Sequence, residues 1–469
     1  MRATLTKYLY HIRSSYWFIP SLMALGAIIL SVITTELDLR YGAKWFSDLG
    51  WATASKPDGA RSILSTIAGS MITVAGVTFS MTIVSVSFAS SQFGPRLIGN
   101  FMRDRGNQFT LGTFIATFVY SLLVLRTIRE AGDVFELGEG NNLSVFVPQV
   151  SLLCAIVLAL LSVGVLIYFI HHIPETIDVS NITAQVGREL EAAIDNLFPK
   201  EVGQPHEEIE SADKPNVPED FHDNSVSIQT GVSGYIQAVD EEGLIEVAKQ
   251  NDLILRLQYR PGDFATKKKT LLKAWPADRV DDGVAKDLQN TFAWGSERTP
   301  TQNAMFLVDQ LVEIIGRALS PGVNDPFTAI SCLKWLQRSL ATLSHREIPS
   351  SYRYDSDHAL RVITHPASFQ DFCSAVFDQT RQYVAADRNV AFEAMEMLAE
   401  LAVDAPEGER RDCLLSHADA LSKAVEQSLP LESDREEIAR RRELAYQVVK
   451  DPDLKKELRD EVGWMGGRG

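Results

Sequence analysis

The sequence is poor in cysteine and lacks the motifs of the common enzyme families. Its four cysteines, Cys154, Cys332, Cys373 and Cys413, stand far apart in the chain. Without a CxxC pair, a disulfide framework and a zinc site are excluded, and we interpret the four as packing residues in a reducing compartment. No P-loop, dinucleotide-binding, nucleophile-elbow or HExxH pattern occurs in a supporting context. We therefore expect no catalytic residue, no metal site and no cofactor.

Charge is missing from four long stretches, although 23% of the whole chain is charged. These stretches are Ser14–Thr35, Ser62–Pro95, Gly106–Leu125 and Gly140–Ile170. A helix needs about 20 apolar residues to cross the roughly 30 Å hydrocarbon core of a bilayer. The pattern predicts a lipid bilayer as partner and transmembrane helices over residues 14–35, 62–91, 107–125 and 145–170. The absence of charge inside these spans disfavours a transporter coupled to protons or sodium.

The two signs of charge are unevenly distributed. Residues 1–170 hold 12 Lys and Arg against 9 Asp and Glu, whereas residues 171–469 hold 33 against 52. The overall net charge of −16 disfavours nucleic acid as a partner. Arg2, Lys7 and Arg13 precede the first span without any acid, so the positive-inside rule predicts that both termini are cytoplasmic.

The remaining chain shows the patterns of a separate α+β domain. After a transmembrane domain over 1–174, we expect a helical connector and acidic linker over 175–224. Alternating apolar residues predict a small β-rich subdomain over 225–280, and helical periodicity predicts a helical cytoplasmic domain over 281–469. The predicted fold class is therefore a membrane α-helical domain of four transmembrane helices joined to a cytoplasmic α+β domain.

The second span is unusually rich in small and hydroxyl-bearing residues. Between residues 62 and 91, 12 of the 30 residues are Ser or Thr. At steps of three, four and seven, one stripe of the helix holds Ser62, Thr66, Gly69, Thr73, Gly76, Ser80 and Ser87. Such a stripe suits either close packing between helices in lipid or the wall of a pore, where hydroxyls solvate a passing ion.

The segment that follows the second span is basic. Gln92, Arg96, Arg103 and Arg105 predict the inner mouth of a pore, and simple positive-inside anchoring is the alternative. The loop after the third span is acidic instead. Its acids, Glu130, Asp133, Glu136 and Glu139, favour cations, whereas the inner arginines favour anions, so the charges leave the ion undetermined.

The sharpest motif in the second half is SPGVNDPFTA, which begins at Ser320. Asn324 or Asp325 can cap a helix whose first residue is Pro326. The alternative is a ligand or metal site built from Arg317, Asn324 and Asp325.

Two runs carry a resemblance to a known family. The run FSMTIVSVSFASSQFGPRLIGNFMRDRGNQFTLGTFIATFVYSLLVLR (Phe79–Arg126) and the run ALSPGVNDPFTA (Ala318–Ala329) resemble a bacterial family of predicted integral membrane proteins, known as a domain of unknown function. The likeness extends over nearly the whole chain. It implies a protein of the bacterial inner membrane with four N-terminal spans and a cytoplasmic C-terminal domain, and it implies no activity.

These observations favour a homo-oligomeric ion channel rather than an enzyme. The second span would line the pore, and the acidic domain would form a vestibule or gate. The alternative is a non-conducting membrane-anchored sensor or scaffold whose cytoplasmic domain binds a ligand or a protein. In that case we expect the second span to pack against its own bundle.

Overall fold

The structure of the chain is a computed structural model that describes residues 15–41, 56–94, 101, 104–129, 146–198, 217–451 and 454. The chain divides into two compact units. We call His11–Ser91 with Pro95–Asp178 the four-helix unit, and the rest, chiefly Val179–Gly469, the α/β unit. Several residues singled out above lie outside the described residues: Arg2, Lys7, Arg13, Arg96, Arg103, Glu130, Asp133, Glu136, Glu139 and residues 201–216 of the linker.

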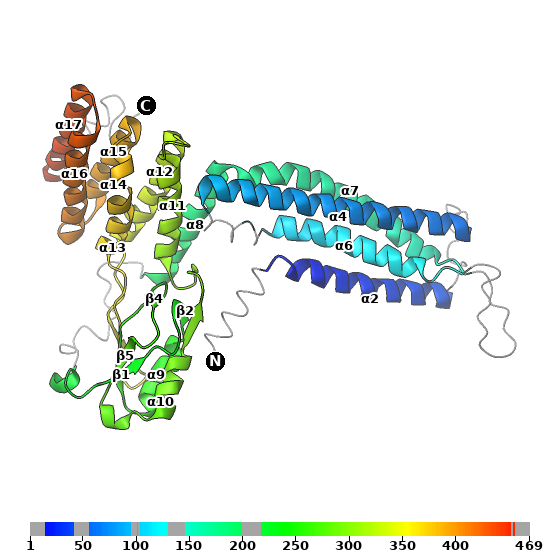
Figure 1. Ribbon diagram of the computed structural model, residues 1–469, viewed down its shortest axis with the longest axis horizontal. Helices are drawn as coiled ribbons and strands as arrows, with labels where there is room; N and C mark the ends of the chain where they lie inside the picture. Colours follow the sequence, from blue (N-terminus) through cyan, green and yellow to red (C-terminus); the bar gives the residue numbers. More distant parts are fainter. Residues whose placement is uncertain are drawn as a thin grey trace. The chain divides into compact units, whose positions relative to one another are not determined.

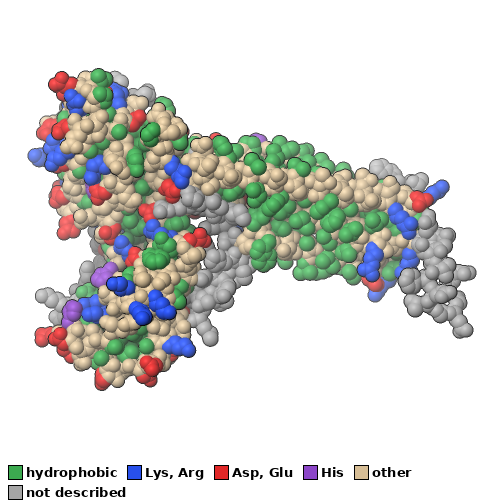
Figure 2. Space-filling view, in the orientation of Figure 1, with side chains coloured by type: hydrophobic (Ala, Val, Ile, Leu, Met, Phe, Trp, Pro, Cys, Tyr) green, Lys and Arg blue, Asp and Glu red, His purple; other side chains and the backbone are tan. Residues whose placement is uncertain are grey.

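The four-helix unit confirms the four predicted helices. They are α2 (Phe18–Tyr41), α4 (Pro57–Phe93), α6 (Arg105–Leu125) and α7 (Gln149–Ile177), which lie side by side in Figure 1. All four are long and apolar enough to cross a membrane. Hydrophobic side chains cover much of their visible outer surface in Figure 2. Because such a surface is costly in water, it suits lipid contact.

Helix α6 is the most enclosed of the four helices. A Cβ atom on Gly112 would lie 3.2 Å from the Cα of Pro20, which shows how closely α2 and α6 approach. The buried Tyr120 hydroxyl lies 2.9 Å from the Thr34 hydroxyl and donates to the Ser151 carbonyl at 3.2 Å. Tyr120 therefore links α6 to both α2 and α7 through hydrogen bonds between helices, a common source of cohesion in apolar surroundings.

A buried carboxylate joins α2 to the start of α7. Helix α2 continues beyond the predicted end at residue 35, so Asp38 lies in its last turns and is only 5% exposed. Its two carboxylate oxygens accept from the Val150 and Ser151 amides, both at 2.9 Å, and from the Ser151 hydroxyl at 2.7 Å. Pro148 at the start of α7 makes no side-chain cap. Asp38 therefore caps α7 from a neighbouring helix.

The described part of the α/β unit contains two small sheets. The five-stranded sheet has the order β1-β5-β3-β8-β7, and only its β3–β8 pair is parallel. Its strands are β1 (Val226–Gln229), β3 (Ile254–Leu257), β5 (Thr270–Trp275), β7 (Tyr352–Tyr354) and β8 (Leu360–Ile363). The three-stranded sheet has the order β4-β2-β6. Its strands are β2 (Gly234–Val239), β4 (Phe264–Ala265) and β6 (Phe292–Gly295).

Two short helices complete the sheet region. These are α9 (Glu241–Gln250) and α10 (Asp282–Asn290). Leu244 of α9 and Leu288 of α10 share one apolar core with strand residues such as Leu255 and Leu272. The described structure thus agrees with a small β-rich part, although β6, β7 and β8 follow residue 280.

Most of the other described residues of the α/β unit form helices. They are α8 (Val179–Leu197), α11 (Ala304–Ala318), α12 (Pro326–Ser344), α13 (Phe369–Cys373), the π-helix η4 (Ser374–Asp378), α14 (Gln379–Val384), α15 (Arg388–Asp404), α16 (Glu409–Ser428) and α17 (Glu432–Lys450). Helix α11 is buried over most of its length and packs against α8, α12, α14 and η4. The mixed α/β region with mainly helical C-terminal residues confirms the predicted fold class.

A close contact between α8 and α12 provides a test of this packing. A Cβ atom on Gly187 would lie 2.5 Å from Cε3 of Trp335. Gly187→Ala is therefore expected to lower the free energy of unfolding by about 2 kcal/mol, because the rigid indole ring has to move. Trp335→Leu in the same chain should restore part of that loss. Hydrogen exchange of the α8 amides in the detergent-solubilised protein measures both effects.

The control is the same substitution in α11. A Cβ on Gly316 would lie 3.7 Å from Cε2 of Tyr383, an ordinary contact. Gly316→Ala should stabilise its helix by up to about 1 kcal/mol, since alanine has the higher helix propensity. Equal effects at positions 187 and 316 would contradict the proposed clash.

An ion-pair network holds the β7–β8 hairpin to the loop before β3. Arg361 of β8 donates to Asp355 at 2.7 Å and to Asp252 at 2.8 Å. The Asp355 side chain is only 1% exposed and also accepts from the Asp357 and Ala359 amides. Burial raises the pKa of Asp355, but the hydrogen bonds from Arg361 and from the two amides outweigh it and lower the pKa to about 2.

This lowered pKa predicts a defined dependence of stability on pH. Asp355 should stabilise the folded state above pH 4, and the contribution should disappear as the pH falls towards 2. Asp355→Asn is therefore expected to cost about 2 kcal/mol at pH 7 and almost nothing near pH 2. Hydrogen exchange of the β8 amides across this range measures the difference.

The matched control lies in the same turn. Asp357 is 71% exposed and pairs with Lys249 at 2.8 Å. Asp357→Asn should change stability by less than about 1 kcal/mol at any pH, because exposed ion pairs contribute little. A pH-independent effect of Asp355→Asn would refute the assigned role of its charge.

Candidate functional site

The predicted stripe lies on one exposed face of α4. All seven of its residues are solvent-accessible in the single chain: Ser62, Thr66, Gly69, Thr73, Gly76, Ser80 and Ser87. The opposite face packs into the bundle through Leu64, Met71, Ala75 and other buried side chains. Apart from the backbone of α4 itself, no atom lies within 4 Å of a Cβ placed on Gly69 or on Gly76. The small residues of the stripe therefore do not serve packing within their own bundle.

The two threonine hydroxyls of the stripe are hydrogen-bonded along the helix. Thr66 donates to the Ser62 carbonyl at 2.7 Å, and Thr73 donates to the Gly69 carbonyl at 2.8 Å. A hydroxyl that donates to a carbonyl one turn earlier keeps its lone pairs available outward. The stripe thus presents a narrow surface of weak hydrogen-bond acceptors rather than charges.

The stripe differs from the exposed faces of the neighbouring helices. On α7 the most exposed large side chains include Leu160 and Ile167, and on α2 they include Leu22 and Val32. These residues are typical of a lipid-facing surface. Large apolar residues such as Val77 and Val84 border the stripe on α4 itself. Large apolar side chains thus dominate the exposed faces of α2 and α7, whereas α4 also exposes a strip of small and hydroxyl-bearing residues.

The predicted inner mouth is described only in part. Gln92 lies half-buried in the last turn of α4, and Arg105 is exposed at the start of α6. Next to Arg105, Asp104 caps α6 by accepting from the Asn107 amide at 2.7 Å.

Asp104 also contacts α7. Its carboxylate lies 2.9 Å from Nε2 of His172, whose ring stacks on Tyr168 at 5.1 Å. Sequence reasoning missed this pair, because the two residues are 68 positions apart. The pair joins the N-terminal end of α6 to α7.

The SPGVNDPFTA motif forms an exposed turn between α11 and α12. Asp325 caps α12 by accepting from the Thr328 amide at 3.1 Å and from its hydroxyl at 2.6 Å, as the capping interpretation predicts. Asn324 has a φ of 50°, a left-handed conformation that asparagine tolerates well. Arg317 pairs with Glu313 at 3.5 Å, one turn earlier in α11. Phe327, the second residue of α12, has a side chain that is 73% exposed.

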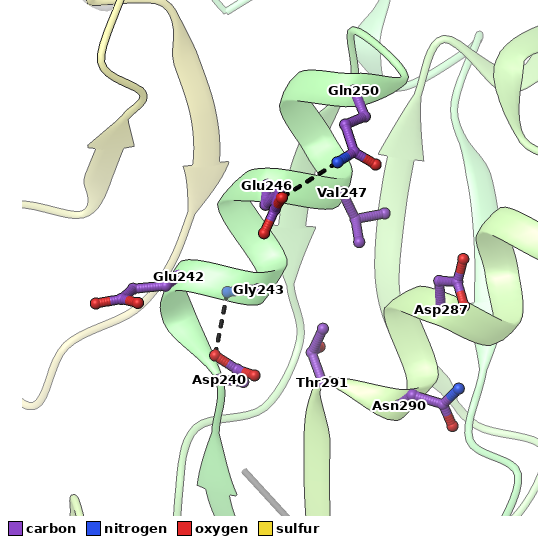
Figure 3. Close-up of a pocket in the computed structure, with 9 residues that line it drawn as sticks. All are labelled: Asp240, Glu242, Gly243, Glu246, Val247, Gln250, Asp287, Asn290 and Thr291. Atoms are coloured by element: carbon purple, nitrogen blue, oxygen red, sulfur yellow. Dashed lines mark hydrogen bonds between the residues drawn. The ribbon is translucent and has the colours of Figure 1, made fainter. Parts of the chain in front are cut away.

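An acidic cavity lies beside α9 and α10 in the α/β unit. It has a volume of about 440 Å³, and Figure 3 shows carboxylates around it: Asp240, Glu242, Glu246 and Asp287. Asp240 accepts from the Gly243 amide at 3.1 Å, and Gln250 donates to Glu246 at 3.2 Å. Its charge suits a cationic small molecule. Among the described residues, no group of three or more His, Cys, Asp or Glu side chains is placed to hold a metal ion.

Comparisons with known proteins agree with this architecture. The family described as "Predicted membrane protein (DUF2254)" matches residues 13–400. Uncharacterized proteins of Mycobacterium bovis and of two strains of Mycobacterium tuberculosis are each 28% identical over 456 residues, which cover 94% of this chain and 82% of the relative. No solved structure matches this chain.

Proposed function

We propose that this chain, which belongs to the DUF2254 family of predicted membrane proteins, is a homo-oligomeric ion channel of the bacterial inner membrane. Copies of α4 would surround a common axis and line the pore with the stripe from Ser62 to Ser87. The α/β unit would form a vestibule or gate on the cytoplasmic side, where the charge distribution of the sequence predicts both termini.

The observation that carries this proposal is the exposure of the whole stripe. A bundle of four helices in one chain buries its own small residues where helices approach closely, as at Gly112 of α6. The seven stripe residues of α4 instead lie opposite the packed face. An exposed polar strip in an apolar surface is best accommodated away from lipid, against water or another copy of the chain.

The chemistry of the strip suits conduction rather than tight binding. Hydroxyl and glycine groups solvate a passing ion weakly, so the ion is not held. The described spans also offer few charges: α7 has none between Gln149 and Ile170, and α6 has none after Arg105. A passive conduit needs no titratable group at the midplane, whereas coupled transport usually does.

The direct test is ion flux through purified protein reconstituted in liposomes. Vesicles that contain the protein should release potassium or chloride faster than empty vesicles, and separate readouts for the two ions identify the selectivity. Analysis of the detergent-solubilised protein by light scattering should give a mass of several chains. A monomer without flux under varied voltage, pH and osmotic pressure would refute the proposal.

A second candidate is the non-conducting sensor or scaffold, and the acidic cavity beside α9 favours it. The volume of about 440 Å³ falls in the range of small-molecule sites. This function predicts that a cationic compound stabilises the α/β unit while the vesicles stay tight. Flux in the liposome experiment would exclude it as the sole function.

A further inference from the structure

Two cysteines that are 40 positions apart in the sequence come together in the α/β unit. Cys373 ends α13 and Cys413 lies in the second turn of α16, and these two helices pack on each other. Cys373 is completely buried, whereas Cys413 is partly exposed. One turn before the cysteines the Arg410 guanidinium lies 5.9 Å from the Phe369 ring, and one turn after them His417 contacts Phe377, so the packing places Cys373 alongside Cys413. The sequence-based interpretation of all four cysteines as packing residues did not anticipate this pair.

His417 and Asp378 lie next to the two cysteines. His417 lies four residues after Cys413, on the same face of α16. Nδ1 of His417 lies 3.5 Å from Oδ1 of Asp378, and its ring packs against Phe377 at 5.3 Å. His417 is only 8% exposed. Arg381 forms an ion pair with the same carboxylate of Asp378.

The π-helix explains how Cys373 and Asp378 reach the same side of α16. These residues are five positions apart, a spacing that points them away from each other in a regular α-helix. Hydrogen bonds in a π-helix run between residues five apart, so one residue lies over the other. The segment η4 covers this interval, Ser374–Asp378. Single π-turns of this kind are frequent at functional sites.

The contacts make the two sulfurs chemically unequal. The hydrogen bond from Cys373, together with that from His417, outweighs burial and lowers the pKa of Cys413 to about 5. The same hydrogen bond and complete burial raise the pKa of Cys373. These shifts favour the thiolate form of the partly exposed Cys413 and the protonated form of Cys373 at neutral pH. Cys413 thus has the properties of an attacking cysteine, and Cys373 has those of a resolving cysteine.

We propose that Cys413 and Cys373 are a redox pair that a hydroperoxide oxidises to a disulfide between α16 and α13. In the first step the Cys413 thiolate attacks a peroxide oxygen. The S–O bond forms, the O–O bond breaks, and the leaving alkoxide or hydroxide takes a proton from water. In the second step the Cys373 sulfur attacks the Cys413 sulfur. The S–S bond forms, the S–O bond breaks, and the hydroxyl leaves with the Cys373 proton as water.

The sulfurs together lose two electrons in this sequence, and the peroxide is reduced to an alcohol or to water. A thiol reductant reverses it by exchange. The redox pair lies within the α/β unit. The proposal of a redox pair therefore does not depend on the proposal of a channel.

The test uses the full-length protein in detergent. After treatment with hydrogen peroxide, peptide mapping without reductant should show one cross-linked peptide that joins Cys373 to Cys413, and dithiothreitol should release it. Cys154 is also partly exposed, so Cys154→Ser is the matched control and should leave the cross-link unchanged. A peroxide-treated protein with four free or over-oxidised thiols, or with a different pairing, would overturn the proposal.

A second measurement does not depend on disulfide formation. The rate at which iodoacetamide alkylates Cys413, read by mass spectrometry at a series of pH values, should have its midpoint near pH 5. Cys373→Ala removes the hydrogen-bond donor and should move this midpoint towards the ordinary thiol value of about 8.5. An unchanged midpoint in that variant, or a wild-type midpoint above pH 8, would contradict the assigned roles.

Discussion

Gly76→Leu is expected to reduce ion flux through the reconstituted protein by about tenfold or more. Gly76 lies near the middle of the stripe, and apart from the backbone of α4 itself a Cβ added there meets no atom within 4 Å. The new side chain therefore fits the single chain without strain and should leave its fold intact. In an oligomer with α4 at the axis, each copy would add one isobutyl group at the same level of the pore. The resulting apolar ring would narrow the pore and exclude water from it.

The matched control is Gly164→Leu on α7. Gly164 is also exposed, is also inside an apolar helix and also has open space around its Cα. The same substitution there should project into lipid and leave flux within about twofold of the wild type. Gly26→Leu on α2 offers a second control of the same kind. Equal flux in the Gly76→Leu and Gly164→Leu proteins would refute a pore lined by α4.

The oligomer mass must be measured in the same samples. Loss of flux with an unchanged oligomer supports a pore wall. Loss of the oligomer itself would show that the stripe is a packing surface between copies, because leucine prevents the close approach that glycine permits. That outcome would reject the stripe as the pore lining.

Asp38→Ala is expected to destabilise the four-helix unit by about 3 kcal/mol. The substitution removes an acceptor from three donors at the start of α7: the Val150 amide, the Ser151 amide and the Ser151 hydroxyl. Water does not readily replace the carboxylate, since Asp38 is only 5% exposed and Ser151 is fully buried. The loss of the negative charge near the helix N-terminus adds to the effect.

Hydrogen exchange of the Val150 and Ser151 amides measures this loss directly in the detergent-solubilised protein. Asp38→Asn keeps one acceptor oxygen and should show a smaller loss. Glu36→Ala is the control on the same helix, because Glu36 is 56% exposed and pairs only loosely with Arg40 at 3.6 Å. Its effect should stay below about 1 kcal/mol. An Asp38→Ala protein as stable as this control would contradict the capping role.

The four apolar helices and the mixed second half were predictable because both depend on local patterns. A run of about 20 residues without charge can be identified as a membrane span from the sequence alone, without knowledge of the fold. The stripe of α4 is equally local, since steps of three and four always share a helix face. The cap at Asp325 follows from three adjacent residues. In each case the decisive partners lie within one helix or one turn.

Local patterns did not predict the contacts between residues that are far apart in the sequence. Asp38 and Ser151 are 113 positions apart, and Asp38 lies outside the predicted span. Strands β7 and β8 join the sheet of β1, β3 and β5 only because the chain returns to it after two long helices. Spacing alone cannot identify such pairs, because any two surfaces of suitable shape can meet.

The sequence by itself determined the class of this protein: four apolar helices, a charged α+β half, and a second helix with a polar stripe. Only the tertiary structure decided which way that stripe faces, since periodicity groups residues on a face but does not orient the face. The tertiary structure also placed Cys373 beside Cys413, because a π-turn and the packing of α13 on α16 create a proximity that no local pattern encodes.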